Sequence, residues 1–170
     1  SETLKNLYDG VTQEDVNTAL VMSSRTLVEK EPNYSYVTAR LLLDDIRAKG
    51  LSRLGVAEKA TQFEMERLYP DALKAFLTLA VESELVSADL LQYNLDTMGA
   101  ALIAERDNQF TYLGLQTLYD RYFIHKDDVR IELPQVFFMR IAMGLALKEE
   151  DREARAIEFY QLLSSFDYMA

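Results

Sequence analysis

The sequence contains no cysteine and no tryptophan, and its only histidine is His125. Without cysteine the chain can form no disulfide, no cysteine-ligated zinc site and no thiol nucleophile. With one histidine it also lacks the paired Glu-x-x-His motifs that bind di-iron centres on facing helices. The sequence therefore predicts no metal site and no catalytic residue in this chain.

Long apolar runs and a basic surface are also absent. The most apolar stretch, residues 136–147, is interrupted by Arg140 and is shorter than the roughly 20 residues that cross a membrane. A net charge of −10 opposes association with nucleic acid or with anionic lipid. Because the first residues form no apolar leader either, we expect a cytoplasmic protein with no membrane and no nucleic-acid partner.

Helical periodicity dominates what is present, because only three prolines and six glycines interrupt the chain. Gly50 is expected to end a helix, Pro70 to open a long helix and Pro134 to open a buried one, since proline is tolerated in a first turn. The helix before Gly50 has an apolar face of Ala39, Leu42, Leu43 and Ile46. Further helices are predicted at residues 15–27, 88–97 and 111–120 and after residue 151.

One pair of short strands interrupts this pattern. Residues 122–124 and 129–131 are rich in β-branched and aromatic side chains, and the polar residues 126–128 separate them. This arrangement is typical of a hairpin. The predicted fold is therefore mainly α, a helical domain with one small β-hairpin near residues 122–131.

Three blocks of unusual residues support a resemblance to a known family. They are Arg106–Tyr112, Leu118–Phe123 and Arg130–Ala142. In this order they resemble the N-terminal helical region of the large subunit of class I ribonucleotide reductases. Three earlier blocks, Leu7–Thr12, Glu31–Tyr36 and Ala39–Leu42, are similar to the closing helices of an ATP-cone, a regulatory module at the N-terminus of many of these subunits.

The resemblance implies two domains: residues 1–50 as the C-terminal helices of an incomplete ATP-cone-like module, and residues 51–170 as the helical domain before the catalytic barrel. It further implies that the chain is a fragment of a ribonucleoside-diphosphate reductase, an enzyme that makes deoxyribonucleotides by cysteine-radical chemistry. The cysteines of that reaction would lie beyond residue 170, so the fragment alone is expected to be inactive. Gln13, Arg47 and Lys49 are the remnants of the cone's nucleotide site that the resemblance identifies.

The resemblance also implies the partners. The parent subunit would use ATP and deoxynucleotide effectors and a metal-containing, radical-generating small subunit, whereas the fragment itself holds no cofactor. The fragment would contact the rest of its own large subunit. Freed from that subunit, it is expected to expose an apolar surface and to self-associate. The candidate residues are Phe159, Leu162, Phe166 and Met169.

Two other interpretations of these residues remain. Tyr119, Tyr122, Tyr160 and Tyr168 could suggest radical transfer, but amphipathic core packing explains them better. In place of an enzyme fragment, the chain could be a free-standing helical protein-interaction module of similar architecture. The contiguous blocks at residues 110–122 and 131–142 favour the reductase interpretation.

Overall fold

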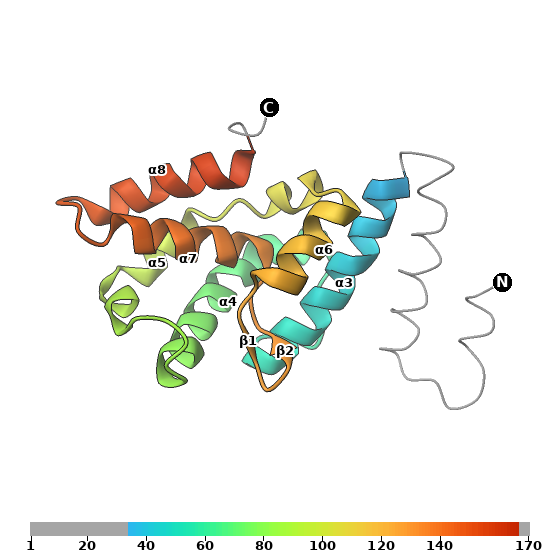
Figure 1. Ribbon diagram of the computed structural model, residues 1–170, viewed down its shortest axis with the longest axis horizontal. Coiled ribbons are helices and arrows are strands. Elements are labelled where there is room, and N and C mark those ends of the chain that lie inside the picture. Colours follow the sequence, from blue (N-terminus) through green and yellow to red (C-terminus); the bar gives the residue numbers. More distant parts are fainter. Residues whose placement is uncertain (1–33, 167–170) are drawn as a thin grey trace.

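The structure is a computed structural model that describes residues 34–166. Figure 1 shows helices α7 and α8 as an antiparallel pair at one end of the molecule and α3 beside α6 at the other, with α4 between them. The α-helices are α3 (Tyr34–Leu54), α4 (Gln62–Glu82), α5 (Leu95–Ala100), α6 (Tyr112–Arg121), α7 (Pro134–Ala146) and α8 (Arg152–Ser165). Two 3₁₀ helices, η1 (Ala88–Gln92) and η2 (Ala104–Gln109), and strands β1 (His125–Lys126) and β2 (Val129–Arg130) complete the described part. The mainly α fold with one small hairpin is thereby confirmed, whereas the helix expected at residues 15–27 lies outside the described residues.

Helix α3 buries the apolar face predicted for it but is longer than expected. Ala39, Leu42, Leu43 and Ile46 are all buried. The prediction that Gly50 ends the helix was wrong: α3 continues to Leu54, and Gly55 follows at φ 73°. Glycine adopts this left-handed conformation without steric cost, so it stops the helix there. Gly50 is instead a buried helical position facing the backbone of Arg130 and the side chain of Leu133.

Helix α4 begins eight residues before the expected start at Pro70, which was also a wrong prediction. The start is fixed by a capping box, in which the Thr61 hydroxyl accepts from the Glu64 amide and the Glu64 carboxylate accepts from the Thr61 amide. Such a box satisfies two helix-terminal donors at once. Pro70 therefore lies inside the helix.

The interior proline marks the place where α5 packs against α4. A Cβ atom on Gly99, in α5, would lie 3.0 Å from both Cα and Cβ of Pro70. Only glycine allows two backbones to approach this closely. The single helix predicted at residues 88–97 is in fact η1 followed by α5, and Asn94 caps α5 by accepting from the Thr97 amide.

The hairpin is confirmed and is shorter than the sequence suggested. His125 pairs with Arg130 and Lys126 with Val129, leaving a two-residue loop. The loop residues Asp127 and Asp128 have φ values of 53° and 65°. Positive φ at both central positions is the geometry of a type I′ turn, which matches the natural twist of two strands. His125 is exposed, as its place beside a turn predicted.

Helix α7 forms the centre of the core, and its predicted start at Pro134 is confirmed. Nine of its residues are buried, and the exposed ones, Gly144 and Leu145, lie near its end. Helix α8 packs along α7 through Ala156 and Tyr160, both fully buried. None of the helices between residues 34 and 166 combines the length and the apolar character needed to cross a bilayer.

The contact between Gly99 and Pro70 gives a prediction about stability. Gly99→Ala should lower the free energy of unfolding by about 1–3 kcal/mol, because the new methyl group forces two packed backbones apart. Gly144→Ala in α7 is the matched control, since a Cβ there meets no atom within 4 Å. The control should raise the stability by about 0.5–1 kcal/mol. Urea denaturation of both variants measures this, and an unchanged midpoint for Gly99→Ala would contradict the packing described.

Candidate functional site

The most elaborate polar arrangement in the described part of the chain surrounds the carboxylate of Asp107. Arg47 Nη2 in α3 donates to Asp107 Oδ2 at 2.9 Å, and the Tyr69 hydroxyl in α4 donates to the same oxygen at 2.6 Å. Gln135 Nε2 in α7 donates to Oδ1 at 2.8 Å. Asp107 itself lies in η2 and is 1% exposed. One carboxylate thus joins four separate elements.

The arrangement continues from Gln135 into α8. The Tyr160 hydroxyl donates to Gln135 Oε1 at 2.6 Å and accepts from the Ile103 amide at 2.9 Å. On the other side, Arg47 Nη2 donates to Gln62 Oε1 at 2.5 Å, and Gln62 donates to the carbonyl of Ala104. We call these side chains the Asp107 cluster. Its members are Arg47, Gln62, Tyr69, Asp107, Gln135 and Tyr160.

Burial makes the charge on Asp107 costly. Burial raises the pKa of the Asp107 carboxyl above its ordinary value, and the Arg47 guanidinium and the hydrogen bonds from Tyr69 and Gln135 oppose that rise. Burial also raises the pKa of the Tyr69 hydroxyl, with the Asp107 charge adding to the effect, so Tyr69 stays protonated and acts as a donor. The carboxylate therefore depends on its three donors to remain in the core.

The cluster has one incomplete contact. Arg47 Nε is buried and has no hydrogen-bond partner among the described residues. Arg47 reaches both of its acceptors through a single nitrogen, Nη2. Its link between α3 and the other elements therefore depends on one atom.

A second buried ion pair attaches the hairpin to α7. Glu132, which is fully buried, accepts from Arg140 Nε at 2.6 Å and Nη2 at 3.0 Å. The same carboxylate accepts from the Ile124 amide at 2.9 Å. Burial raises the pKa of the Glu132 carboxyl, and Arg140 opposes the rise. The two hydrogen bonds from Arg140 fix the segment between β2 and α7 relative to α7 itself.

Of the residues predicted as nucleotide-site remnants, the two in the described part of the chain, Arg47 and Lys49, have different partners. Arg47 points into the core, where it is 2% exposed, and Lys49 Nζ lies 3.1 Å from Asp45 Oδ2, one turn earlier in α3. Gln13 lies outside the described residues. Their assignment as remnants of a nucleotide site stays a prediction. Within residues 34–166, no three histidine or acidic side chains gather in a way that could hold a metal ion.

Sequence reasoning missed the Asp107 cluster as a site. Asp107 and Gln135 lie in the blocks that carry the family resemblance, but neither was assigned a role from the sequence. The available signal was Gln135, a polar residue among the apolar neighbours of a predicted buried helix, and it was too weak to name the partners. Asp107 follows Arg106 and precedes Asn108, so its own neighbours gave no sign that it is buried. Of the tyrosines expected to pack in the core, Tyr160 is buried, Tyr119 is half-buried and Tyr168 lies outside the described residues. Tyr122 is 57% exposed, so that expectation was wrong.

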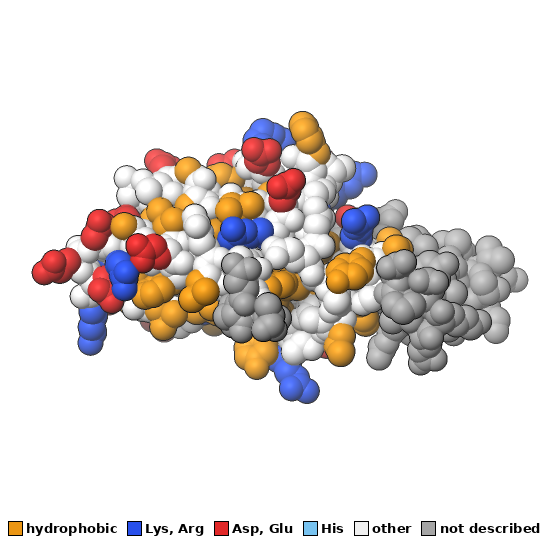
Figure 2. All heavy atoms as spheres, turned by 90° about the horizontal axis from the view of Figure 1, so that it is seen from above, with side chains coloured by type: hydrophobic (Ala, Val, Ile, Leu, Met, Phe, Trp, Pro, Cys, Tyr) orange, Lys and Arg blue, Asp and Glu red, His pale blue; other side chains and the backbone are white. Residues whose placement is uncertain are grey.

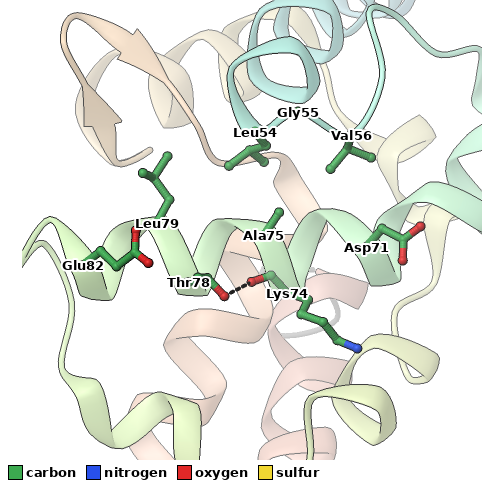
Figure 3. Close-up of a pocket in the computed structure, with 9 residues that line it drawn as sticks. All are labelled: Leu54, Gly55, Val56, Asp71, Lys74, Ala75, Thr78, Leu79 and Glu82. Atoms are coloured by element: carbon green, nitrogen blue, oxygen red, sulfur yellow. Dashed lines mark hydrogen bonds between the residues drawn. The ribbon is translucent and has the colours of Figure 1, made fainter.

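A surface hollow of about 550 Å³, drawn in Figure 3, lies between the end of α3 and one face of α4. The residues that line it form no convergent set of catalytic groups. Leu54 and Val56 overhang Ala75 and Leu79, whereas the Lys74 side chain extends away and pairs with Asp96 at 2.7 Å. Thr78 donates to the carbonyl of Lys74, so its hydroxyl is occupied by its own helix. The hollow is an open groove of mixed character.

The apolar surface expected near α8 is only partly present. Leu162 is 53% exposed, whereas Phe159 is half-buried and Met169 lies outside the described residues. The Phe166 ring packs edge-on against Phe110, with ring centroids 5.1 Å apart. On the face seen in Figure 2, hydrophobic side chains are interspersed with charged and polar ones. Self-association stays a prediction.

These observations define a class: a helical domain organised by a buried polar cluster. Residues 108–170 match the ribonucleotide reductase all-alpha domain. The chain is 43% identical over 164 residues to the ribonucleoside-diphosphate reductase subunit alpha of Chlamydia muridarum. The aligned residues make up 96% of this chain and 15% of the relative. The subunit alpha of Helicobacter pylori is 34% identical over 163 residues (95% of this chain, 19% of the relative), and the large subunit of Danio rerio is 27% identical over 165 residues (96% and 19%).

The chain corresponds to the N-terminal region of ribonucleotide reductase large subunits, including their all-alpha domain. It spans less than a fifth of the length of the relatives named here.

The Asp107 cluster predicts an unequal effect of two similar substitutions. Asp107→Asn should lower the free energy of unfolding by about 3–5 kcal/mol, because it leaves the Arg47 guanidinium buried without its counter-ion. Asp96→Asn is the control, since it removes a carboxylate that is 85% exposed and pairs with Lys74 at the surface. Exposed pairs contribute little, so the control should unfold almost as the unaltered chain does. Urea denaturation compares the two variants, and equal losses would mean that Arg47 does not depend on Asp107.

Proposed function

We propose that the chain is the N-terminal helical portion of a ribonucleoside-diphosphate reductase large subunit and that it takes no direct part in the chemistry. The observation that carries this proposal is the 43% identity to such a subunit over nearly the whole of a chain that contains no cysteine. In the parent enzyme, a cysteine radical and two reducing thiols convert ribonucleoside diphosphates to deoxyribonucleotides. All of these thiols would belong to other parts of the subunit.

Two modules are proposed within the chain. Residues 1–50 would close an incomplete ATP-cone-like module, and residues 51–170 would form the helical domain that precedes the catalytic barrel. Helix α3 crosses the boundary at residue 50 without interruption. A continuous helix is a stiff connection, so the two modules would move together at this point.

The proposed role of the chain is that of a scaffold between regulation and catalysis. The parent subunit would bind ATP and deoxynucleotide effectors in its complete cone and would receive its radical from a metal-containing small subunit. The partner of this chain would be the rest of its own subunit. The rigid attachment of α3 to α4, η2 and α7 through Asp107 supports this role, because a scaffold must keep its elements in register.

The 170-residue chain alone should not bind nucleotides. Of the three remnants, Arg47 is held by Asp107 and Lys49 is paired with Asp45, so neither presents an unengaged charge to a triphosphate. Calorimetric titration with ATP and with dATP should give no saturable heat, and the chain mixed with a small subunit should show no reductase activity. Saturable binding that Lys49→Ala abolishes would mean that the cone remnant still functions.

Sequencing the source gene on both sides of the coding region tests the assignment directly. The reading frame should continue past Ala170 into a segment with the cysteines that the reaction needs. A frame that ends at Ala170 would remove the reductase proposal. It would instead favour a free-standing helical interaction module, for which Phe63, 89% exposed at the start of α4, is the most exposed large apolar side chain in the described part of the chain.

A further inference from the structure

We propose that the Asp107 cluster is a mechanical relay that couples the position of α3 to that of α8. This inference deepens the proposed scaffold function by naming the contacts through which a displacement would pass. The two helices lie at different ends of the molecule (Figure 1). Helix α3 packs against α4, α6, η2 and β2, whereas α8 packs chiefly against α7 and α5.

The path consists of four consecutive side chains. Arg47 on α3 contacts Asp107 at 2.9 Å, Asp107 contacts Gln135 at 2.8 Å, and Gln135 contacts Tyr160 on α8 at 2.6 Å. Each of these four residues is at most 2% exposed. Water therefore cannot replace a lost hydrogen-bond partner without a large cost in free energy. Each contact therefore constrains the next.

Two features make the relay respond in a switch-like manner. Arg47 holds both Asp107 and Gln62 through one nitrogen, so a displacement of α3 that moves Nη2 breaks both contacts together. Gln135 uses its amide nitrogen for Asp107 and its amide oxygen for Tyr160. A rotation of this one amide group therefore alters the contacts to η2 and to α8 at the same time.

The end of the relay reaches the backbone. Besides donating to Gln135, the Tyr160 hydroxyl accepts from the Ile103 amide just before η2. Arg106 in η2 donates to the Ser164 hydroxyl at 2.6 Å, and Gln109 donates to the Ser164 carbonyl near the end of α8. The C-terminal end of α8 would thus receive any change that begins at Arg47.

A double-mutant cycle in the 170-residue chain tests the relay. The variants are Arg47→Met, Tyr160→Phe and their combination, with unfolding equilibrium constants measured in urea. The two effects should be coupled by at least about fivefold, although no hydrogen bond among the described residues joins the two side chains directly. Tyr93→Phe is the matched control, because its buried hydroxyl donates to the Met143 carbonyl on α7 and has no contact with the cluster. Arg47→Met and Tyr93→Phe should combine independently, to within about twofold.

A second measurement keeps the test valid if Arg47→Met does not fold. Arg47→Lys retains the charge but loses the planar fork, and it should shift the amide resonance of Ile103, which Arg47 does not contact. Arg53→Lys is the control, since Arg53 is also on α3 but pairs with the exposed Asp127. Additive effects in the cycle together with an unmoved Ile103 resonance would overturn the relay. Such a failure would leave the family assignment intact, whereas a reading frame that ends at Ala170 would remove the assignment and leave the relay standing.

Discussion

The carboxylate of Asp107 is the contact on which the arrangement of this domain depends. Apolar packing brings the helices together without fixing their register, because hydrophobic contact is not directional. A buried anion is directional, since each of its donors must stand at a defined distance and angle. Asp107 receives these donors from α3, α4 and α7 and so determines how three helices meet. The same dependence makes the site vulnerable, because no donor can leave without exposing a buried charge to an apolar medium.

The sequence predicted the elements of the fold well where the signal is local. The hairpin turn, the first turn at Pro134 and the apolar face of α3 each depend on residues within a few positions of one another. The start of α4 differs from the one expected at Pro70, although the capping box at Thr61 and Glu64 that fixes it is an equally local feature of the sequence. The continuation of α3 beyond Gly50 could not be predicted locally, since Gly50 is buried beside Arg130 and Leu133, which are distant in sequence.

The Asp107 cluster could not be predicted in the same way. Arg47 and Asp107 are 60 residues apart in the chain, and their pairing follows from the completed packing of α3 against η2. From sequence, Arg47 resembled a surface cation of a nucleotide site, because arginine is rarely buried unless it is paired. The family resemblance identified the right blocks, including Asp107 and Gln135, without giving the reason for their presence. The geometry supplies that reason, which is structural.

Arg47 lies on the N-terminal side of residue 50, the domain boundary that the sequence predicts, whereas its partner Asp107 lies on the other side. A polypeptide begun at residue 51 would keep residues 108–170, which match the all-alpha domain, yet it would lack the cation that neutralises Asp107. It would also lose the buried face of α3 against α6, so the remaining core would meet water along that side. A shortened polypeptide that keeps both the Arg47–Asp107 pair and the contact of α3 with α6 must therefore start at or before Tyr34, the first described residue of α3.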